Sequence, residues 1–274
     1  MKFSVLMSVY YREKGQYLHE AIESIWSHQT MRPSEIVVVK DGPLNDELEE
    51  VLSFWQSRLQ NKLRIVALDK NVGLGRALNH GLANCSYDIV ARMDSDDISV
   101  PERFEKQITY MLKYGVDVVG SSVMEFDPDG STPKQARRVP LDHKEIEKFA
   151  KFRNPMNHPT VVFMKYAVES VGGYRDMPGF EDYDLWVRLL QKKYVFANIN
   201  ENLVLMRAGN SQVNRRRGMA YVLSEFLFQN HLLRAGFINP LIYAVNLILR
   251  LPPRLLPRTA LATIYRLLRV GIHQ

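Results

Sequence analysis

The sequence predicts an α/β fold with a mostly parallel central sheet flanked by helices, followed by a basic amphipathic helical extension at the C-terminus. Two observations predict the sheet. Over the first 120 residues, short runs rich in β-branched residues alternate with amphipathic stretches, which is typical of parallel strands joined by crossover helices. Acidic residues stand directly after two of these runs, and the ligands of open α/β sheets bind at such strand ends.

The expected elements of the first half follow in order along the chain. The strands are Phe3–Val9, Glu35–Lys40, Leu63–Leu68, Asp88–Met93 and Val116–Gly120. A helix is expected between the first two strands, because four apolar residues share one helical face: Leu18, Ile22, Ile25 and Trp26. A second helix is expected over Leu44–Leu59, after the turn residues Gly42 and Pro43.

The regular alternation ends near residue 121. Asp127-Pro128-Asp129-Gly130 is a strong turn signal, and the polar residues after it predict a loop that continues to Pro140. Beyond this loop we expect a helix near Asp142–Phe152, a strand at Thr160–Met164 and a helix that begins near Phe180.

Residues 205–274 differ in composition from the rest. They contain ten arginines, no lysine and one acidic residue, Glu225, and so carry +9, although the whole chain carries only +6. Prolines separate three expected helices, which are Tyr221–Leu233, Leu241–Leu249 and Ala260–Val270. The longest apolar run, Phe237–Leu249, is shorter than the roughly 20 residues that a membrane-spanning helix needs. We expect residues 211–274, which include Arg215-Arg216-Arg217, to lie on an anionic membrane. Packing of these helices on residues 1–210 is the alternative.

These patterns divide the chain into two parts. Residues 1–210 are expected to form one domain, with the regular alternation in its first half, 1–120, and not in its second half, 121–210. Residues 211–274 are expected to form the membrane-associating extension. A chain of 274 residues with 46% apolar composition can bury one sizeable core of this kind. Cys85 is the single cysteine, which excludes an internal disulfide and a thiolate zinc site, and favours a reducing compartment.

The sharpest chemical signal is the segment Arg92-Met93-Asp94-Ser95-Asp96-Asp97, which follows an apolar run. Three carboxylates at a strand end repel one another unless a cation neutralises them, and Mg²⁺ or Mn²⁺ prefers such oxygen ligands. A helix cap or a solvated acidic turn is the alternative for this segment alone. Asp41 follows a second strand, and both strand ends should face one crevice. There Asp41 can accept an N–H of a pyrimidine ring, although Asp41-Gly42 alone is more often a turn.

Two further segments join a loop to a helix. Gly73 and Gly75 precede an expected helix start, where backbone N–H groups favour phosphate and Arg76 adds a fixed charge. Leu78 stands where a dinucleotide-binding fingerprint has its third glycine, which disfavours an oxidoreductase. In the other segment, acidic residues from Glu181 to Asp184 crowd a first helical turn. The helix dipole alone favours acids there, but a carboxylate in that place can also act as a base.

Five motifs together resemble glycosyltransferase family 2 in order and spacing, over about residues 3–210. They are Ser4–Tyr10, Val39–Gly42, Asn71–Leu74, Met93–Asp97 and Glu181–Leu185. His158-Pro159-Thr160-Val161 is similar to a segment of the bacterial O-antigen and exopolysaccharide enzymes of the amylovoran type. The resemblance implies a GT-A fold, Mn²⁺ or Mg²⁺ as cofactor, and a single displacement that gives a β-linked product from an α-linked donor. It also implies that residues 1–210 are the catalytic domain, with a nucleotide-binding half over 1–120 and an acceptor-binding half over 121–210.

On the donor side, the resemblance implies that Asp41 holds uracil and that Arg76 lies near the nucleotide or its phosphates. It implies that Asp94 contacts the nucleotide and metal region and that Asp96 ligates the metal. Three residues at and after the first strand are also expected at the nucleotide: Val9, Tyr11 and Glu13.

On the acceptor side, the resemblance implies that Asp182 is the base and that Glu181 assists it or binds the acceptor. His158 and Asp97 are candidates for contact with the acceptor. A lone histidine before proline is more often structural, so both readings of His158 stay open.

The expected function is transfer of a hexose from a UDP-sugar to a saccharide on a lipid diphosphate, in bacterial O-antigen, lipopolysaccharide or exopolysaccharide synthesis. Glucose is the expected hexose, with galactose next, and GlcNAc is the expected acceptor sugar. We expect the enzyme at the inner face of the cytoplasmic membrane, with an anionic membrane surface and no nucleic acid as partner. A nucleotidyltransferase is one alternative, although Ser8–Arg12 lacks its glycine- and arginine-rich phosphate loop. A non-enzymatic basic binding protein is another, but it leaves the acidic strand ends unexplained.

Overall fold

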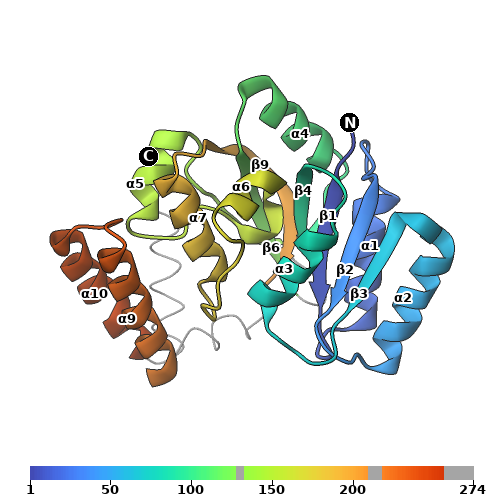
Figure 1. Cartoon of the computed structure of the whole chain (residues 1–274), viewed down its shortest axis with the longest axis horizontal. Coiled ribbons are helices and arrows are strands. Elements are labelled where there is room, and N and C mark those ends of the chain that lie inside the picture. The colour runs from blue at the N-terminus through green and yellow to red at the C-terminus, as the bar shows by residue number, and fades with distance from the viewer. Residues whose placement is uncertain (128–132, 209–217, 256–274) are drawn as a thin grey trace.

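The computed structural model describes residues 1–127, 133–208 and 218–255 (Figure 1). Within them, a sheet of nine strands has the order β3-β2-β1-β4-β8-β6-β9-β5, with β7 paired to β6. The strands are β1 Ser4–Val9, β2 Glu35–Lys40, β3 Leu63–Ala67, β4 Ile89–Asp94, β5 Ile98–Ser99, β6 Val118–Phe126, β7 Pro133–Arg137, β8 Val162–Met164 and β9 Phe196–Arg207.

The first four strands of the chain run parallel. β1 pairs with β2 and with β4, and β2 pairs with β3, all in parallel. β8 is antiparallel to both β4 and β6, while β9 again runs parallel to β6. The expected mostly parallel sheet is therefore confirmed. In this register Val9 lies beside Lys40 and Ser8 beside Asp94, so the residues that follow β1, β2 and β4 meet at one edge.

Helices cover both faces of the sheet. They are α1 Gly15–Trp26, α2 Asp46–Leu59, α3 Leu74–Asn84, α4 Arg103–Tyr114, α5 His143–Ala150, α6 Lys165–Ser170, α7 Glu181–Gln191, α9 Met219–Arg234 and α10 Pro240–Leu255. Two 3-10 turns cover Gln60–Lys62 and His158–Thr160.

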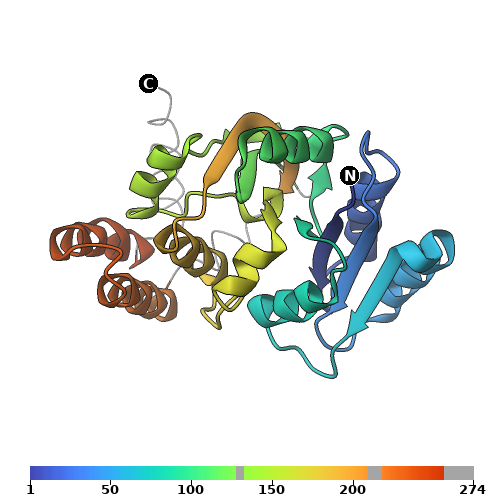
Figure 2. The ribbon, with the colours of Figure 1, turned by 45° about the horizontal axis from the view of Figure 1, so that its top comes forward.

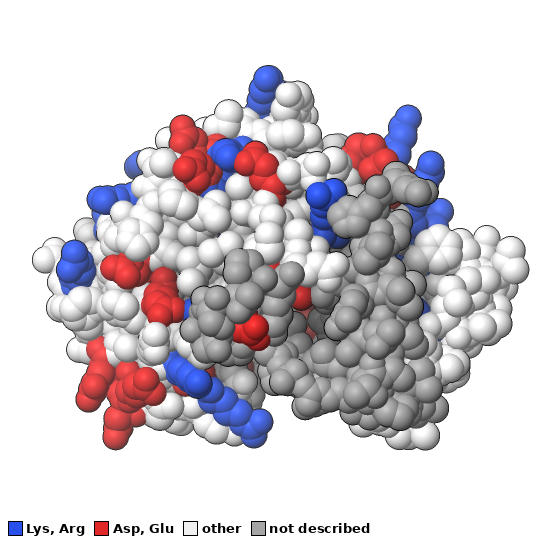
Figure 3. All heavy atoms as spheres, turned by 180° about the vertical axis from the view of Figure 1, so that it is seen from behind, with Lys and Arg blue, Asp and Glu red and all other residues white. Residues whose placement is uncertain are grey.

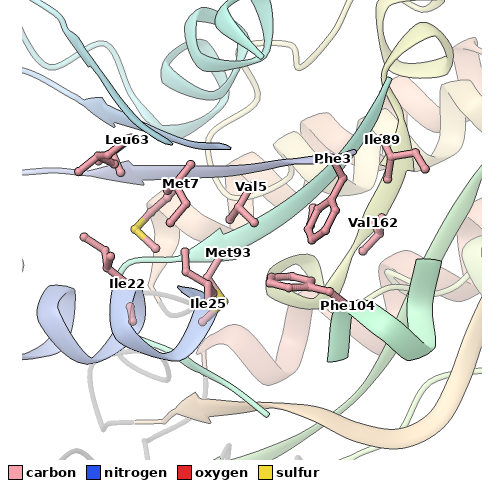
Figure 4. Close-up of a cluster of buried hydrophobic side chains, with 14 of the residues drawn as sticks. Phe3, Val5, Met7, Ile22, Ile25, Leu63, Ile89, Met93, Phe104 and Val162 are labelled. Carbon is pink, nitrogen blue, oxygen red and sulfur yellow. The ribbon is translucent and has the colours of Figure 1, made fainter. Parts of the chain in front are cut away.

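The central strands bury both of their faces because their side chains alternate between two cores. In β1, Val5 and Met7 point to a core shared with α1, α2 and α4 (Figure 4). Leu6 points to the opposite core, which α3, α5, α6 and α7 complete. Phe3 also packs edge-on against Phe104 of α4, with ring centroids 5.1 Å apart. Fully burying one such side chain stabilises the fold by about 1.5–3 kcal/mol.

Several elements differ from the sequence expectation. The loop expected up to Pro140 is wrong in part, because β6 continues to Phe126 and β7 pairs with it over Pro133–Arg137. Sequence reasoning also missed α4 and β9. The extent of β6 was not evident from the sequence because the strand contains polar residues. Ser121 of β6 is buried, and its backbone N–H and carbonyl form hydrogen bonds with the side chains of Thr160 and Asn157.

The C-terminal helices pack on the rest of the fold. α9 and α10 form a hairpin, and Figure 2 shows α7 lying between this hairpin and α6. Phe228 and Leu232 of α9 share a buried cluster with Phe180, Tyr183 and Val187. None of the described helices is long and apolar enough to cross a membrane. The third expected helix, 260–270, and Arg215–Arg217 lie outside the described residues.

The second expected tail helix is longer than its sequence suggested. α10 continues through Pro252 and Pro253, which were expected to end it. Arg254 in its last turn ion-pairs with Glu225 of α9, and this contact holds the last turn on the neighbouring helix.

Candidate active site

Asp41 lies at the end of β2 and fastens the loop that follows β3. Its Oδ1 accepts the backbone N–H of Val72 at 2.7 Å and its Oδ2 accepts that of Gly73 at 3.2 Å. Gly42 has a φ of +88°, and a Cβ there would lie 2.6 Å from the backbone nitrogen of Asn71, so this turn requires glycine. Each carboxylate oxygen has a second lone pair, so Asp41 can still accept one more N–H.

The three residues expected near the nucleotide, Val9, Tyr11 and Glu13, have different surroundings in the structure. The carbonyl of Val9 accepts the backbone N–H of Asp41 at 2.8 Å. Tyr11 is exposed beside Arg12, whose guanidinium lies over its ring. Glu13 instead reaches the acidic segment after β4, since the Ser95 hydroxyl donates to its Oε2 at 3.2 Å. Burial raises the pKa of Glu13, and nearby Asp94 raises it further.

Asp94, Asp96 and Asp97 form a compact cluster of carboxylates. One oxygen of each can be chosen so that all three lie within 4.8 Å of one another. Burial raises the pKa of Asp96 to about 7, and the charges of Asp94 and Glu13 act in the same direction. Burial and the neighbouring aspartates also raise the pKa of Asp97, whose Oδ2 is buried without a hydrogen-bond partner among the described residues. This all-oxygen set fits a hard divalent cation such as Mn²⁺ or Mg²⁺.

Arg207, at the end of β9, holds this cluster in place. Its backbone N–H donates to Asp97 Oδ1 at 2.8 Å, and its Nε donates to the carbonyl of Asp96 at 2.8 Å. Its Nη2 ion-pairs with Glu20 of α1, and its guanidinium lies 4.0 Å from the centroid of the Tyr17 ring. Sequence reasoning missed this residue; the available signal was an arginine directly after a β-rich run.

A second arginine, Arg92, contacts Asp94 from the buried part of β4. Arg92 of β4 is buried and ion-pairs with Asp94, while its Nε and Nη1 have no hydrogen-bond partner among the described residues. The carbonyl of Arg92 accepts a hydrogen bond from Arg103 Nη2 at 2.6 Å. The sequence motif contained Arg92 but gave it no role. An arginine inside an apolar strand was the signal.

Asp182 and Glu181 open α7. Asn154 Nδ2 donates to Asp182 Oδ2 at 2.6 Å, and the backbone N–H of Tyr183 donates to Asp182 Oδ1 at 2.8 Å. Glu181 Oε2 accepts the N–H of Gly179 at 2.9 Å, and burial raises the pKa of Glu181 to about 7. Asn154 is a further residue that sequence reasoning missed, because it lies 28 positions from its partner.

Asp184, in the same acidic segment, serves the structure. It is fully buried and pairs with Arg188 at 2.7 Å and with His231 of α9 at 3.0 Å. Asp184 is therefore held inside the fold, and Glu181 and Asp182 are the candidates of this segment for contact with a substrate.

Tyr174 brings the two acidic groups into one site. It is buried, and burial raises its pKa; the charges of Asp182, Asp94 and Glu181 add to this rise while Arg92 opposes it. The charges of Asp94 at the end of β4 and of Asp182 and Glu181 at the start of α7 thus act on the same side chain. Asp41 joins them from the same sheet edge.

His158 and Arg76 occupy different parts of this region. His158 Nε2 lies 3.0 Å from the hydroxyl of Tyr174, and its ring packs edge-on against Trp186. Burial and the charge of Arg92 lower its pKa well below the usual value, so His158 is neutral beneath Tyr174. Arg76 is exposed in the first turn of α3 and pairs with Asp176 at 2.5 Å, where it can turn toward an anion.

Comparison with solved structures agrees with this architecture. The fold matches S. aureus TarS 1–349 in complex with UDP-GlcNAc with a TM-score of 0.65 at 18% identity, over 90% of this chain and 70% of that one. It matches the mannosyltransferase PcManGT of Pyrobaculum calidifontis, in complex with GDP-Man and Mn²⁺, with a TM-score of 0.64 at 17% identity, over 98% and 74%. At these identities the likeness concerns the GT-A fold alone.

Sequence relatives cover nearly the whole chain. The amylovoran biosynthesis glycosyltransferase AmsE of Erwinia amylovora is 42% identical over 98% of this chain and 100% of its own length. An Escherichia coli UDP-Gal:alpha-D-GlcNAc-diphosphoundecaprenol beta-1,3-galactosyltransferase is 38% identical over 97% and 95%. The family model of glycosyl transferase family 2 matches residues 4–172, which contain the strand-end carboxylates described above. The chain therefore belongs to glycosyl transferase family 2.

Proposed function

We propose that this chain is an inverting hexosyltransferase that moves a hexose from a UDP-sugar to a saccharide on a lipid diphosphate, in the synthesis of a bacterial surface polysaccharide. One observation supports the proposal: Asp94 of the carboxylate cluster after β4 and the separate carboxylate Asp182 both raise the pKa of the buried Tyr174, so both charges act on one side chain. A cluster suited to a diphosphate-bound cation and a second carboxylate suited to a base are the two groups that a single displacement needs.

The donor side is formed by the ends of β1, β2 and β4. Asp41 would accept the N–H of uracil, and Asp94 and Asp96 would hold the divalent cation. When bound, the cation would neutralise the negative charge that develops on the departing diphosphate. Arg207 and Arg92 keep the aspartates in position, since one binds the backbone of the loop and the other pairs with Asp94.

The acceptor side is formed by the start of α7. Asp182 would take the proton of the acceptor hydroxyl while that oxygen forms its bond to the anomeric carbon. The bond between this carbon and the diphosphate oxygen breaks in the same step, and UDP leaves with the electron pair. Attack from the face opposite to UDP inverts the anomeric centre. Asn154 orients Asp182 for this task by donating to its Oδ2.

The proposal also names candidates for the donor hexose and for the acceptor sugar. The relative from E. coli is named for UDP-galactose and a GlcNAc-diphosphoundecaprenol acceptor, which supports galactose beside the glucose expected from sequence. We keep both hexoses as candidate donors and a GlcNAc diphosphate lipid as the acceptor. We also propose that the enzyme works at the inner face of the cytoplasmic membrane, where such an acceptor would be anchored.

The test is a transfer assay with purified full-length protein. UDP-glucose, UDP-galactose and UDP-GlcNAc are offered separately with Mn²⁺ and a short-chain GlcNAc diphosphate lipid, and the product is digested with β- and α-specific glycosidases. We expect one hexose to be transferred and only the β-specific enzyme to release it. Formation of UDP-sugar from UTP and a sugar 1-phosphate, without transfer to the lipid, would instead identify a nucleotidyltransferase.

A further inference from the structure

The hairpin of α9 and α10 carries an apolar outer surface. On α9, Leu223 and Leu227 are 56% and 57% exposed. On α10, Leu241, Ile248 and Leu249 are 73%, 70% and 65% exposed. Within each helix these residues repeat at spacings of four, seven or eight, which places them on one side of the helix. We call these five side chains the hairpin face.

Three charged side chains of the hairpin pair with one another in its interior, whereas Arg234 is exposed at the end of α9. Glu225 is buried and pairs with Arg250 at 2.6 Å and with Arg254 at 3.3 Å. These arginines lower the pKa of Glu225, so the buried group is a carboxylate neutralised by its partners. Two of the arginines that the sequence assigned to a membrane surface are therefore used inside the protein. The part of the hairpin edge that is left uncovered in Figure 3 shows few charged side chains.

The hairpin is anchored next to the proposed base. Phe228 of α9 stacks on Phe180 with ring centroids 4.5 Å apart and packs against Tyr183 at 4.9 Å. Phe180 and Tyr183 flank Glu181 and Asp182 in the chain. α9 therefore packs against the first turn of α7, which carries the proposed base.

We propose that the hairpin face inserts into the surface of a lipid bilayer and holds the site of α7 over it. The sequence on both sides of the hairpin supports a bilayer as the occupant. Arg215–Arg217 precede α9, three more arginines follow α10, and Glu225 is the one acidic residue after Glu201. Apolar side chains between cationic segments match the acyl chains and anionic headgroups of a membrane. The proposal rests on the proposed function in one respect, which is that a lipid-linked acceptor has to be reached at that surface.

Co-sedimentation with vesicles tests this inference. Full-length protein is mixed with phosphatidylcholine vesicles with and without phosphatidylglycerol, at low and high salt. The variant Ile248→Ser with Leu249→Ser should lose vesicle binding at least about tenfold, and Leu241→Ser should weaken it. Leu112→Ser on α4 is the matched control, since Leu112 is 50% exposed but far from the hairpin in sequence and fold. Unchanged melting temperatures establish that each variant is folded.

The possible results separate the alternatives. Vesicle binding that persists in the folded hairpin variants would overturn the proposal. A change of oligomeric state without a change in vesicle binding would also overturn it, because the hairpin face would then be an interface between two copies of the chain. Transfer to the short-chain acceptor in the absence of vesicles reports on the proposed function alone. Hairpin-dependent binding without any transfer would leave the docking surface standing while the proposed function fails.

Discussion

Arg207→Met removes the side chain that joins the carboxylate loop to α1. The change keeps the backbone hydrogen bond to Asp97 but removes the donor to the Asp96 carbonyl and the ion pair with Glu20. It also leaves the Glu20 carboxylate without its guanidinium. Hydrogen bonds that involve a charged group contribute about 1.5–3 kcal/mol each, and Glu20 is partly open to water, which lowers its share. We therefore expect a loss of about 3 kcal/mol of unfolding free energy.

Two measurements follow from this number. A loss of that size should lower the melting temperature by about 2–4 °C per kcal/mol, hence by roughly 6–12 °C, in a thermal unfolding experiment. The loop would also hold Asp96 less firmly, so the Mn²⁺ concentration for half-maximal transfer should rise. Arg207→Lys keeps the positive charge, but a single ammonium group cannot reach both the Asp96 carbonyl and Glu20 as the guanidinium does. We therefore expect its melting temperature and its Mn²⁺ requirement to lie between those of the native protein and Arg207→Met.

Arg58→Met is the control, because Arg58 is an exposed arginine on α2 and should leave both measurements unchanged. An Arg207→Met protein that melts lower but keeps its Mn²⁺ requirement would show that Arg207 supports the fold without positioning the loop. Unchanged stability would refute the reasoning altogether.

Three further outcomes are expected. Asp182→Asn should still bind the UDP-sugar, but its rate of transfer should fall by about 10²–10⁴-fold. Asn154→Ala should lower turnover less. Near-normal turnover of Asp182→Asn in a radiochemical assay would assign the base to Glu181 instead. Chelation by EDTA should abolish transfer and added Mn²⁺ or Mg²⁺ should restore it, whereas Asp96→Ala should stay inactive; full activity in excess EDTA is the contrary result. Burial raises the pKa of Glu181 in the folded protein to about 7, above its usual 4.5. Between these pH values the folded protein therefore binds more protons than the unfolded chain. Its free energy of unfolding falls as the pH rises through this range. Relative to the native protein, Glu181→Gln should therefore gain stability from pH 4.5 to 7 in denaturant titrations, and a constant difference would contradict the assignment.

The sequence by itself determined the parallel half of the sheet and its acidic edge. β1, β2 and β4 are nearly continuous apolar runs, as expected for strands buried on both faces, and each signals its own end by the polar residues that follow. Asp41 and Asp94 therefore meet at one edge for a local reason, which is that parallel neighbouring strands end on the same side.

The tertiary structure decided how that edge is held and completed. Arg207 lies 110 positions from Asp97 and 187 from Glu20, and Asn154 contacts Asp182 from a separate loop. No periodicity connects such residues, because the path of the chain through β9 and α7 brings them together. The same holds for the hairpin: its sequence shows arginines and apolar residues at helical spacing, but Glu225 decides which arginines turn inward. The buried carboxylate takes Arg250 and Arg254 as partners, since a buried charge without a partner would be far less stable than one paired inside the protein.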